Sequence, residues 1–404
     1  MTRVPEAMGD EVSREASGLV WSLVREALVA SAASPAGVAE DGTAATADAA
    51  DRRRAPQASP RVWARAWQLV RSNSVEGLTW AAARHRPDLP RALRDPWSAA
   101  ADETLWRCLQ FDIARERVVA ALTARGFELL PLKGAVVAPL YPDPSMRSMV
   151  DNDILYRLPG ADLPRAQREL ARAMASLGFE PEHVGEGCHD TFVAPPCLSF
   201  EMHHRLFQDR DGRLAAIEAR YRDPWALAGP GPAPSWPAHE HYLYHICHAY
   251  KHYEVAGCGI RCLADEMVLL EAWGDELDLD RIEAELAALG PVAAFERRLR
   301  RCAQGARDPE LIAELLGSGA YGTVEGFVGR GLEAARRAGE APWRARARYV
   351  RGRLLPRGEA DAHVYRVAGV RLPVPLALPF RVGRALTVRL PRTLAELRAL
   401  MRSR

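Results

Sequence analysis

Lysine is nearly absent from this sequence. The 404 residues include 54 Lys and Arg, yet only Lys133 and Lys251 are lysines. Replacement of Lys by Arg together with abundant Ala is typical of a high-GC coding bias, under which a retained lysine calls for a cause. The ammonium of lysine is a compact point charge, whereas the guanidinium of arginine is a planar fork of donors. Phosphate-binding sites use these two groups differently. Both lysines are therefore candidate functional residues.

Long apolar runs are also missing. No stretch approaches the ~20 apolar residues of a membrane span, and the first residues lack the apolar segment of a signal peptide. We therefore expect a cytoplasmic protein with no membrane partner. The formal net charge of +2 gives no general reason to expect nucleic-acid binding. The seven cysteines are scattered without a C-x-x-C pair, so we expect free thiols.

The length of the chain predicts two or three packed units. The patterns divide it into an N-terminal helix over 1–32, a flexible linker over 33–60, a helical region over 61–126, an α/β core over 127–210, a helical domain over 238–350 and a basic, Pro-containing tail over 351–404. The predicted fold class is α+β, with a small mixed sheet flanked by N-terminal and C-terminal helical regions.

The predicted core alternates strands and helices. "FELLPL" reads as a buried strand, Gly134 opens a brief helix, and "VDNDILYRL" is a strand with alternating sides. A helix follows with Asp162 as N-cap and Gly178 at its end, and then a hairpin of "DTFVAP" and "LSFEMHHRL". Downstream we expect helices over 238–254, 262–274, 279–289 and a long Ala/Arg-rich segment from 292 to about 350.

Carboxylates gather on the predicted strands. Asp151 and Asp153 are two residues apart, so on a strand they project from one face. Two unpaired carboxylates that close repel each other, and a cation between them relieves the repulsion. Oxygen ligands of this kind suit Mg²⁺ or Mn²⁺. If the hairpin strand lies beside the Asp strand, Glu201 supplies a third carboxylate, as in two-ion phosphoryl-transfer sites.

Positive charge for phosphate binding is found at the preceding strand-to-helix junction. Lys133 offers an ammonium there, and Gly134 allows a close backbone approach at a helix N-terminus. Arg147 is a second candidate for the triphosphate. Taken singly, an Asp-x-Asp is more often a solvated strand end and Lys133 a surface lysine. The order of these residues along the chain favours the catalytic interpretation.

These residues resemble the uncharacterised nucleotidyltransferase family of the DNA polymerase β-like superfamily. The likeness covers roughly residues 105 to 275. Its pattern corresponds here to Leu132-Lys133-Gly134, Tyr141-Pro142, Arg147, Asp151 with Asp153, Phe200-Glu201-Met202-His203, and a downstream helix with His248 and His252 before Arg261 and Asp265. The superfamily usually has a glycine before the first aspartate and a small apolar residue after it, where this chain has Val150 and Asn152.

The resemblance implies a metal-dependent transfer of a nucleoside monophosphate from an NTP to a hydroxyl or similar acceptor, with release of pyrophosphate. It implies that Asp151 and Asp153 hold two Mg²⁺ or Mn²⁺ ions. Glu201 would bind the catalytic ion and help to deprotonate the acceptor. Lys133 and Arg147 would neutralise charge on the phosphates. The acceptor is not implied, and we expect a small molecule, with a protein or an RNA as alternatives.

A stripe of histidines follows one helical face, because His241, His245, His248 and His252 are spaced by four, three and four residues. One interpretation is a zinc or iron site. The interpretation we favour is a helix packed on the catalytic core, whose histidines line the nucleotide or acceptor cleft. The residues that we expect around the metal ligands or the acceptor are His203, His248, Lys251, His252 and Asp265.

The roles of a few remaining residues and two alternative functions are also open. For Arg261 and Asp265 we favour a structural pair over a position facing the acceptor. For His183 and His189, which lie in loop-like sequence, we favour surface roles over a position covering the site. An RNA- or protein-modifying enzyme of toxin type is an alternative function, although only the Arg-rich C-terminal half offers a basic face. A non-catalytic binding or regulatory module on a nucleotidyltransferase-like core is the alternative from outside enzymology, and the intact carboxylates argue against it.

Overall fold

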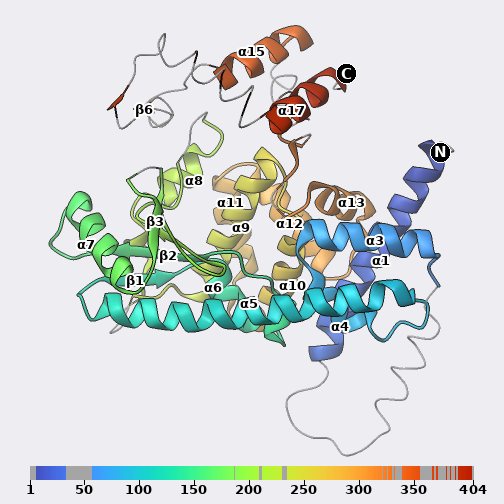
Figure 1. The fold of residues 1–404 in the computed structure, drawn as a ribbon, viewed down its shortest axis with the longest axis horizontal. Coiled ribbons are helices and arrows are strands. Elements are labelled where there is room, and N and C mark those ends of the chain that lie inside the picture. Colours follow the sequence, from blue (N-terminus) through green and yellow to red (C-terminus); the bar gives the residue numbers. More distant parts are fainter. Residues whose placement is uncertain are drawn as a thin grey trace, which may run out of the picture.

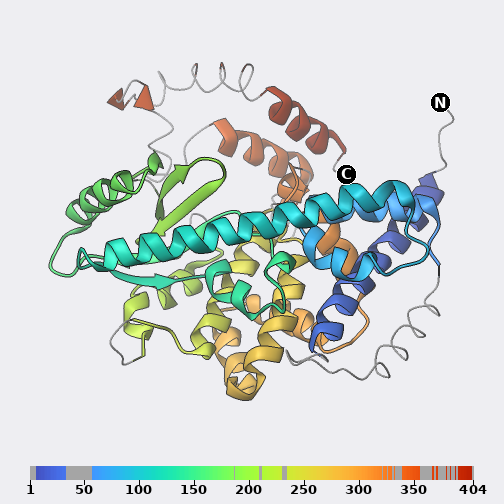
Figure 2. The ribbon, with the colours of Figure 1, turned by 60° about the horizontal axis from the view of Figure 1, so that its bottom comes forward.

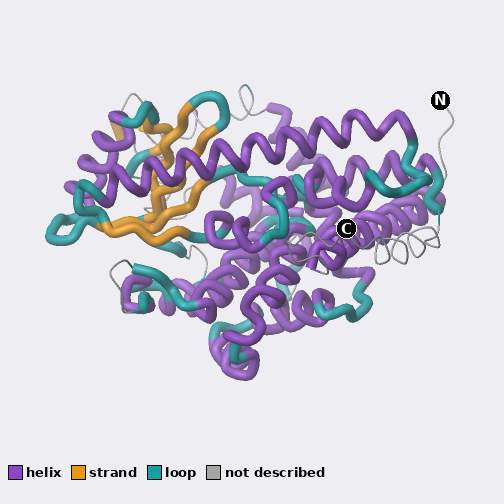
Figure 3. The backbone as a smooth tube through the Cα atoms, turned by 90° about the horizontal axis from the view of Figure 1, so that it is seen from below, coloured by secondary structure: helices purple, strands orange, loops and turns teal. Residues whose placement is uncertain are grey.

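Helices make up most of the computed structural model, and one small sheet lies at one end of it (Figures 1 and 3). The structure describes residues 6–32 and 57–320, apart from 186, 209–211 and 230–233, together with shorter segments beyond 320. The predicted α+β class with a mixed sheet is confirmed. Among the described helices, none combines the length and apolar character needed to cross a bilayer.

The sheet has five strands in the order β1-β2-β5-β4-β3. β2 and β5 are parallel, and every other pair in the sheet is antiparallel. The strands are β1 (Glu128–Pro131), β2 (Asn152–Arg157), β3 (Glu180–His183), β4 (His189–Ala194) and β5 (Leu198–His203). β3 was not expected, because its four residues are exposed at the sheet edge and carry no apolar alternation.

One face of the sheet is covered by two helices, α5 (Arg91–Thr123) and α7 (Leu163–Ser176). α7 begins as predicted, since Asp162 accepts a hydrogen bond from the Arg165 amide at 2.9 Å. Phe200 and Met202 of β5 are fully buried in the core that these helices form with the sheet. Alternate residues of the same strands therefore point to the opposite face.

The other end of α5 reaches the N-terminal helices α1 (Glu6–Ala32), α3 (Pro60–Asn73) and α4 (Glu76–Ala83) (Figure 2). With 33 residues, α5 spans about 50 Å. The largest apolar core joins these helices to a second group that follows the sheet. That group contains α8 (Ala215–Arg220), α9 (Ala238–Val255), α10 (Arg261–Trp273), α11 (Leu279–Ala288), α12 (Val292–Ala303) and α13 (Pro309–Ser318).

Short 3-10 turns accompany the helices and connect them. They are η1 (Ala138–Leu140) and η2 (Pro144–Met146) before β2, η3 (Pro224–Leu227) before α9, and η4 (Gly274–Glu276) after α10. The brief helix expected from Gly134 is α6 (Gly134–Val137).

The expectation of one long helical segment from 292 to about 350 is wrong. The chain breaks at Gly305 and Gly319, whose φ angles of 103° and 66° lie in the left-handed region. α12 and α13 are therefore separate, and α15 (Pro342–Leu354) follows later. The tail contains β6 (Arg366–Val367), β7 (Val370–Arg371) and α17 (Leu390–Arg402). Positions 33–56 of the predicted linker, and many of the tail positions, lie outside the described residues.

A buried polar cluster lies between α9, α10 and α12. The Tyr242 hydroxyl is 2.6 Å from Glu266 Oε1 and 3.0 Å from Glu296 Oε1. Arg300 Nε donates to Glu296 Oε1 at 2.7 Å, whereas Glu266 forms no ion pair within the described residues. Burial, and then the charge of Glu296, raises the pKa of the Glu266 carboxyl to about 8 despite the hydrogen bond from Tyr242.

This cluster predicts a loss of stability with rising pH. The unfolded chain ionises Glu266 near its ordinary pKa of 4.5, while the folded chain keeps its proton up to about pH 8. Folding therefore binds a proton between these values, and the contribution to the free energy of unfolding falls by up to about 1.4 kcal/mol per pH unit. Urea denaturation of Glu266→Gln between pH 5 and pH 8 should show a smaller decline than the parent protein. Equal declines would contradict the prediction.

Candidate functional site

Three carboxylates converge on the sheet face that points away from α5 and α7. In the parallel pair of β2 and β5, Asp153 lies directly opposite Glu201. Neighbouring strands are about 4.8 Å apart, and paired residues point to the same side. Asp151 immediately precedes β2, two residues before Asp153. The condition under which Glu201 supplies the third carboxylate, that its strand lies beside the strand of Asp153, is thus met.

Lys133 lies among these carboxylates. The Leu132 amide donates to the Asp153 carbonyl at 2.9 Å, which fixes the next residue beside β2. Lys133 adopts a positive φ of 47°, uncommon for a residue with a side chain. Its Nζ lies 2.5 Å from Asp153 Oδ1 and 3.8 Å from Glu201 Oε2. The ammonium was expected to face phosphates across a gap, and in this structure it binds a carboxylate directly.

The negative charge of the site exceeds what Lys133 neutralises. Burial, and then the charge of Asp153, raises the pKa of the Asp151 carboxyl to about 7. For Asp153 burial acts in the same direction, but Lys133 and His203 outweigh it and hold the pKa of that carboxyl far below its usual range. The oxygen donors and the uncompensated charge fit a divalent cation, since an added positive charge stabilises all three carboxylates.

Two histidines extend the site. His203 Nε2 lies 2.8 Å from Asp153 Oδ1 and 3.5 Å from Glu201 Oε2, and His189 Nε2 lies 3.6 Å from Glu201 Oε1. His203 therefore contacts the metal-ligand candidates, as expected for a residue behind them. The favoured surface role of His189 in a loop is wrong, and the alternative of a position at the site agrees with its contact to Glu201. β4 begins at His189, directly opposite His203. Extending the predicted strand by one residue would have placed both imidazoles on one face.

α9 presents a second group of side chains to the carboxylates: Tyr244, His248, Lys251 and His252. Burial, and then the positive charge of Lys133, lowers the pKa of the Lys251 ammonium to about 8. Electrostatic interactions also link Lys251 to Asp153 and Glu201. The two lysines of the chain therefore lie close to the same carboxylates. Tyr244 was not predicted, although it precedes His248 by one helical turn on the same face.

The predicted histidine stripe divides into separate environments. His248 and His252 have Nε2 atoms 3.2 Å apart on the side that faces the carboxylates. His241 packs between two tryptophan rings, Trp236 and Trp273. His245 is buried with its Nε2 3.9 Å from Asp265. In the described part of the chain the stripe does not gather three metal-ligand atoms, which favours the packing interpretation.

Arg147 forms a buried ion pair in place of the expected exposed phosphate contact. Its Nε and Nη2 donate to Asp265 Oδ1 and Oδ2 at 2.8 and 3.0 Å, and the Tyr141 hydroxyl donates to Oδ1 at 2.8 Å. The charge of Arg147 outweighs burial and lowers the pKa of Asp265 to about 2. The favoured pairing of Asp265 with Arg261 is not found, because Arg261 donates to the Ser148 carbonyl at 3.2 Å.

Gly134 makes room for this ion pair. A Cβ atom at position 134 would lie 2.7 Å from Arg147 Nη1 and 2.9 Å from Met149 Sδ. Both contacts are shorter than real Cβ atoms show, and the guanidinium is held by Asp265. The group that closely approaches Gly134 is therefore the Arg147 guanidinium. From the sequence we expect a phosphate in that place.

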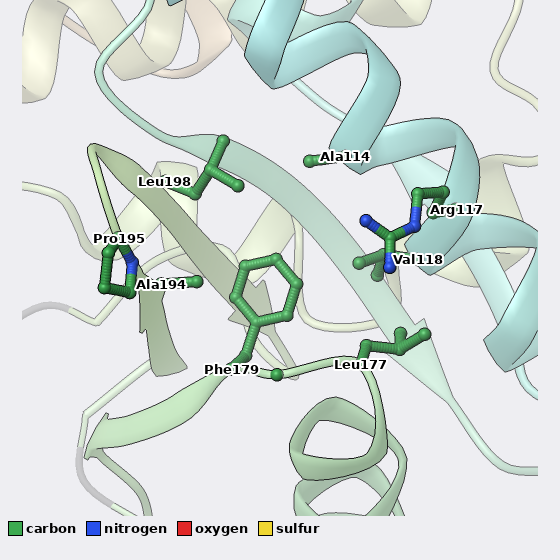
Figure 4. Close-up of a pocket in the computed structure, with 9 residues that line it drawn as sticks. Ala114, Arg117, Val118, Leu177, Phe179, Ala194, Pro195 and Leu198 are labelled. Carbon is green, nitrogen blue, oxygen red and sulfur yellow. The ribbon is translucent and has the colours of Figure 1, made fainter.

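A hollow of about 200 Å³ lies elsewhere in the core region (Figure 4). It is lined mainly by apolar side chains between α5 and the turn that joins β4 to β5, with Arg117 at one side. Ala114 and Val118 of its lining belong to the core on the α5 face of the sheet. The carboxylates point to the opposite face, so this hollow is not part of the candidate site.

The crowding at Gly134 predicts that Gly134→Ala destabilises the protein by about 1 to 3 kcal/mol, as overpacking does. Gly317→Ala is the matched control, because it lies in α13 and its Cβ would meet nothing within 4 Å. That control should be neutral or stabilising by up to about 1 kcal/mol. The free energy of unfolding from urea titrations separates the two. Equal effects would show that position 134 has room to spare.

The family model described as uncharacterised nucleotidyltransferase matches residues 59–305, more than half of the chain. No curated protein and no solved structure matches the chain. The matched range runs from α3 to the end of α12 and includes both lysines, the three carboxylates and Asp265. The chain therefore belongs to the uncharacterised nucleotidyltransferase family.

Proposed function

We propose that this protein transfers a nucleoside monophosphate from an NTP to an acceptor hydroxyl and releases pyrophosphate, with two Mg²⁺ or Mn²⁺ ions bound by Asp151, Asp153 and Glu201. The observation that carries the proposal is the parallel pairing that aligns Asp153 with Glu201 on one face. Membership of the nucleotidyltransferase family supports the reaction class. The acceptor we propose is a small molecule.

The three carboxylates have different surroundings, which suggests different roles. When bound, divalent cations in such a site stabilise the attacking and leaving oxygens of the displacement. Asp153 keeps 3 % of its side-chain exposure and is held by Lys133 and His203, so its oxygens are fixed in direction. Glu201 keeps 25 %, which leaves it accessible to an incoming hydroxyl. We assign to Glu201 the removal of the acceptor proton.

The triphosphate requires positive charge that is not already used. Arg147 is bound to Asp265, so we propose that it positions the segment before β2 and makes no phosphate contact. Lys251 has no carboxylate within ion-pairing distance among the described residues, and its Nζ lies 5.8 Å from the centre of the Phe207 ring. We propose that Lys251 binds the triphosphate from α9, with Lys133 on the opposite side and the amide of Gly134 beside it.

Asp151→Asn tests the metal-ligand assignment. Asp151 forms no hydrogen bond or ion pair with another described residue, so the amide should preserve the fold while removing a charged ligand. Labelled α-phosphate NTPs incubated with cell extract should transfer label at least about 100-fold more slowly than with the parent protein. Glu180→Gln, which removes an exposed carboxylate from β3, should keep the parent rate. Full activity of Asp151→Asn would refute the assignment.

Lys251→Met tests the phosphate contact. Loss of a charge-assisted hydrogen bond should weaken binding of a non-hydrolysable NTP analogue with Mg²⁺ by about 10- to 100-fold in calorimetric titrations. Lys251→Arg keeps the positive charge and should lose less affinity. The melting temperature of both variants without nucleotide reports whether the fold is intact. An unchanged Kd for Lys251→Met would show that the ammonium does not meet the triphosphate.

A further inference from the structure

The imidazoles beside Glu201 form a ligand set of their own. His189, Glu201 and His203 bring one possible ligand atom each within 4.8 Å of one another. The shortest separations from Glu201 are 3.5 Å to His203 Nε2 and 3.6 Å to His189 Nε2. In a tetrahedral site with bonds of about 2.0–2.1 Å, ligand atoms lie about 3.3 Å apart. These two separations involve different oxygens of Glu201, Oε2 toward His203 and Oε1 toward His189, so a single ion would need both oxygens or a rotation of the carboxylate.

A second group in the described chain, with one histidine and two glutamates, shows what a structural cluster of similar side chains looks like. His239, Glu240 and Glu285 also have ligand atoms within 4.8 Å of one another. There, Arg220 Nη2 lies 2.8 Å from Glu240 and 3.0 Å from Glu285, so both carboxylates are already paired with a guanidinium. Glu201 has no arginine partner among the described residues, and its nearest lysine nitrogen is 3.8 Å away.

The orientation of His203 directs one ring nitrogen toward the carboxylates. Its Nε2 faces Asp153 and Glu201, while its buried Nδ1 has no hydrogen-bond partner among the described atoms. Binding of an ion at Nε2 needs the neutral tautomer that carries its proton on Nδ1, and that buried N–H has no acceptor among the described atoms, so the bond to the ion must offset one unpaired donor. The hydrogen bond from Nε2 to Asp153 is then replaced by the bond to the ion.

We propose that His189, Glu201 and His203 bind a divalent transition-metal ion, such as Zn²⁺ or Co²⁺, in preference to Mg²⁺. Imidazole nitrogens suit these borderline ions, whereas Mg²⁺ prefers oxygen ligands and keeps its water. Three protein ligands leave positions open for water or a substrate oxygen. These three residues lie next to Asp153 and Lys133, at the edge of the carboxylate site. The inference stands on the two histidines and does not require that the chain turns over NTP.

Titration of the metal-stripped, untagged full-length protein with Co²⁺ alone tests this proposal, because the visible absorption of Co²⁺ reports its ligands. We expect one bound Co²⁺ per chain, displaced by an equimolar amount of Zn²⁺ and retained in the same amount of Mg²⁺. His189→Ala should weaken Co²⁺ binding by at least about tenfold. His189 keeps 35 % of its side-chain exposure, so its replacement should spare the fold.

His239→Ala is the matched control, since it removes an imidazole from the cluster already filled by Arg220, and it should leave Co²⁺ binding unchanged. The absence of Co²⁺ binding, displacement by equimolar Mg²⁺, or equal affinities of His189→Ala and the parent protein would each overturn the proposal. Label transfer from NTP with Mg²⁺ is measured separately. Transfer without Co²⁺ binding would reject the histidine site alone, and Co²⁺ binding without transfer would reject the nucleotidyltransferase assignment alone.

Discussion

The parallel pairing of β2 with β5 is the constraint on which the candidate site depends. It brings Asp153 beside Glu201, although α7 and a β-hairpin separate them in the sequence. Side chains alternate along a strand, so a slip of one residue would turn Glu201 into the core and Phe200 toward the lysines. Burial of Phe200 against α5 and α7 prevents that slip. The apolar core on one face thus sets the position of the charges on the other.

A second constraint joins the sheet to the helices that follow it. The pair of Arg147 with Asp265 is almost fully buried, and both carboxylate oxygens accept hydrogen bonds. The attraction within a buried pair is offset by the loss of hydration, so its benefit is in geometry more than in net stability. It connects the segment before β2 to α10, which follows α9 in the chain. Tyr141, which donates to Asp265, strengthens the same connection.

The sequence predicts well what local chemistry decides. The cap at Asp162 and the alternating strands depend on neighbours within a few residues. The partners of Lys133 and Arg147 depend on contacts between residues 20 and 118 positions apart, which no periodicity encodes. Arginine is a residue type that often binds phosphate. Only the fold shows that the guanidinium of Arg147 is already bound to Asp265. His189 was missed because the start of β4 has no strong apolar alternation.

The preference for lysine at position 133 follows from the charge balance of the site. An arginine there would hold Asp153 through a planar fork, with two hydrogen bonds in a fixed plane. A single ammonium instead contacts Asp153 and reaches toward Glu201 from one point. A divalent cation bound to Oδ1 of Asp153 would compete with the Lys133 ammonium for that oxygen. An ammonium released in this way would carry an unpaired charge beside the site, and the phosphates of an NTP would neutralise it. The carboxylate contact of Lys133 is therefore compatible with the phosphate contact that we propose for the same side chain.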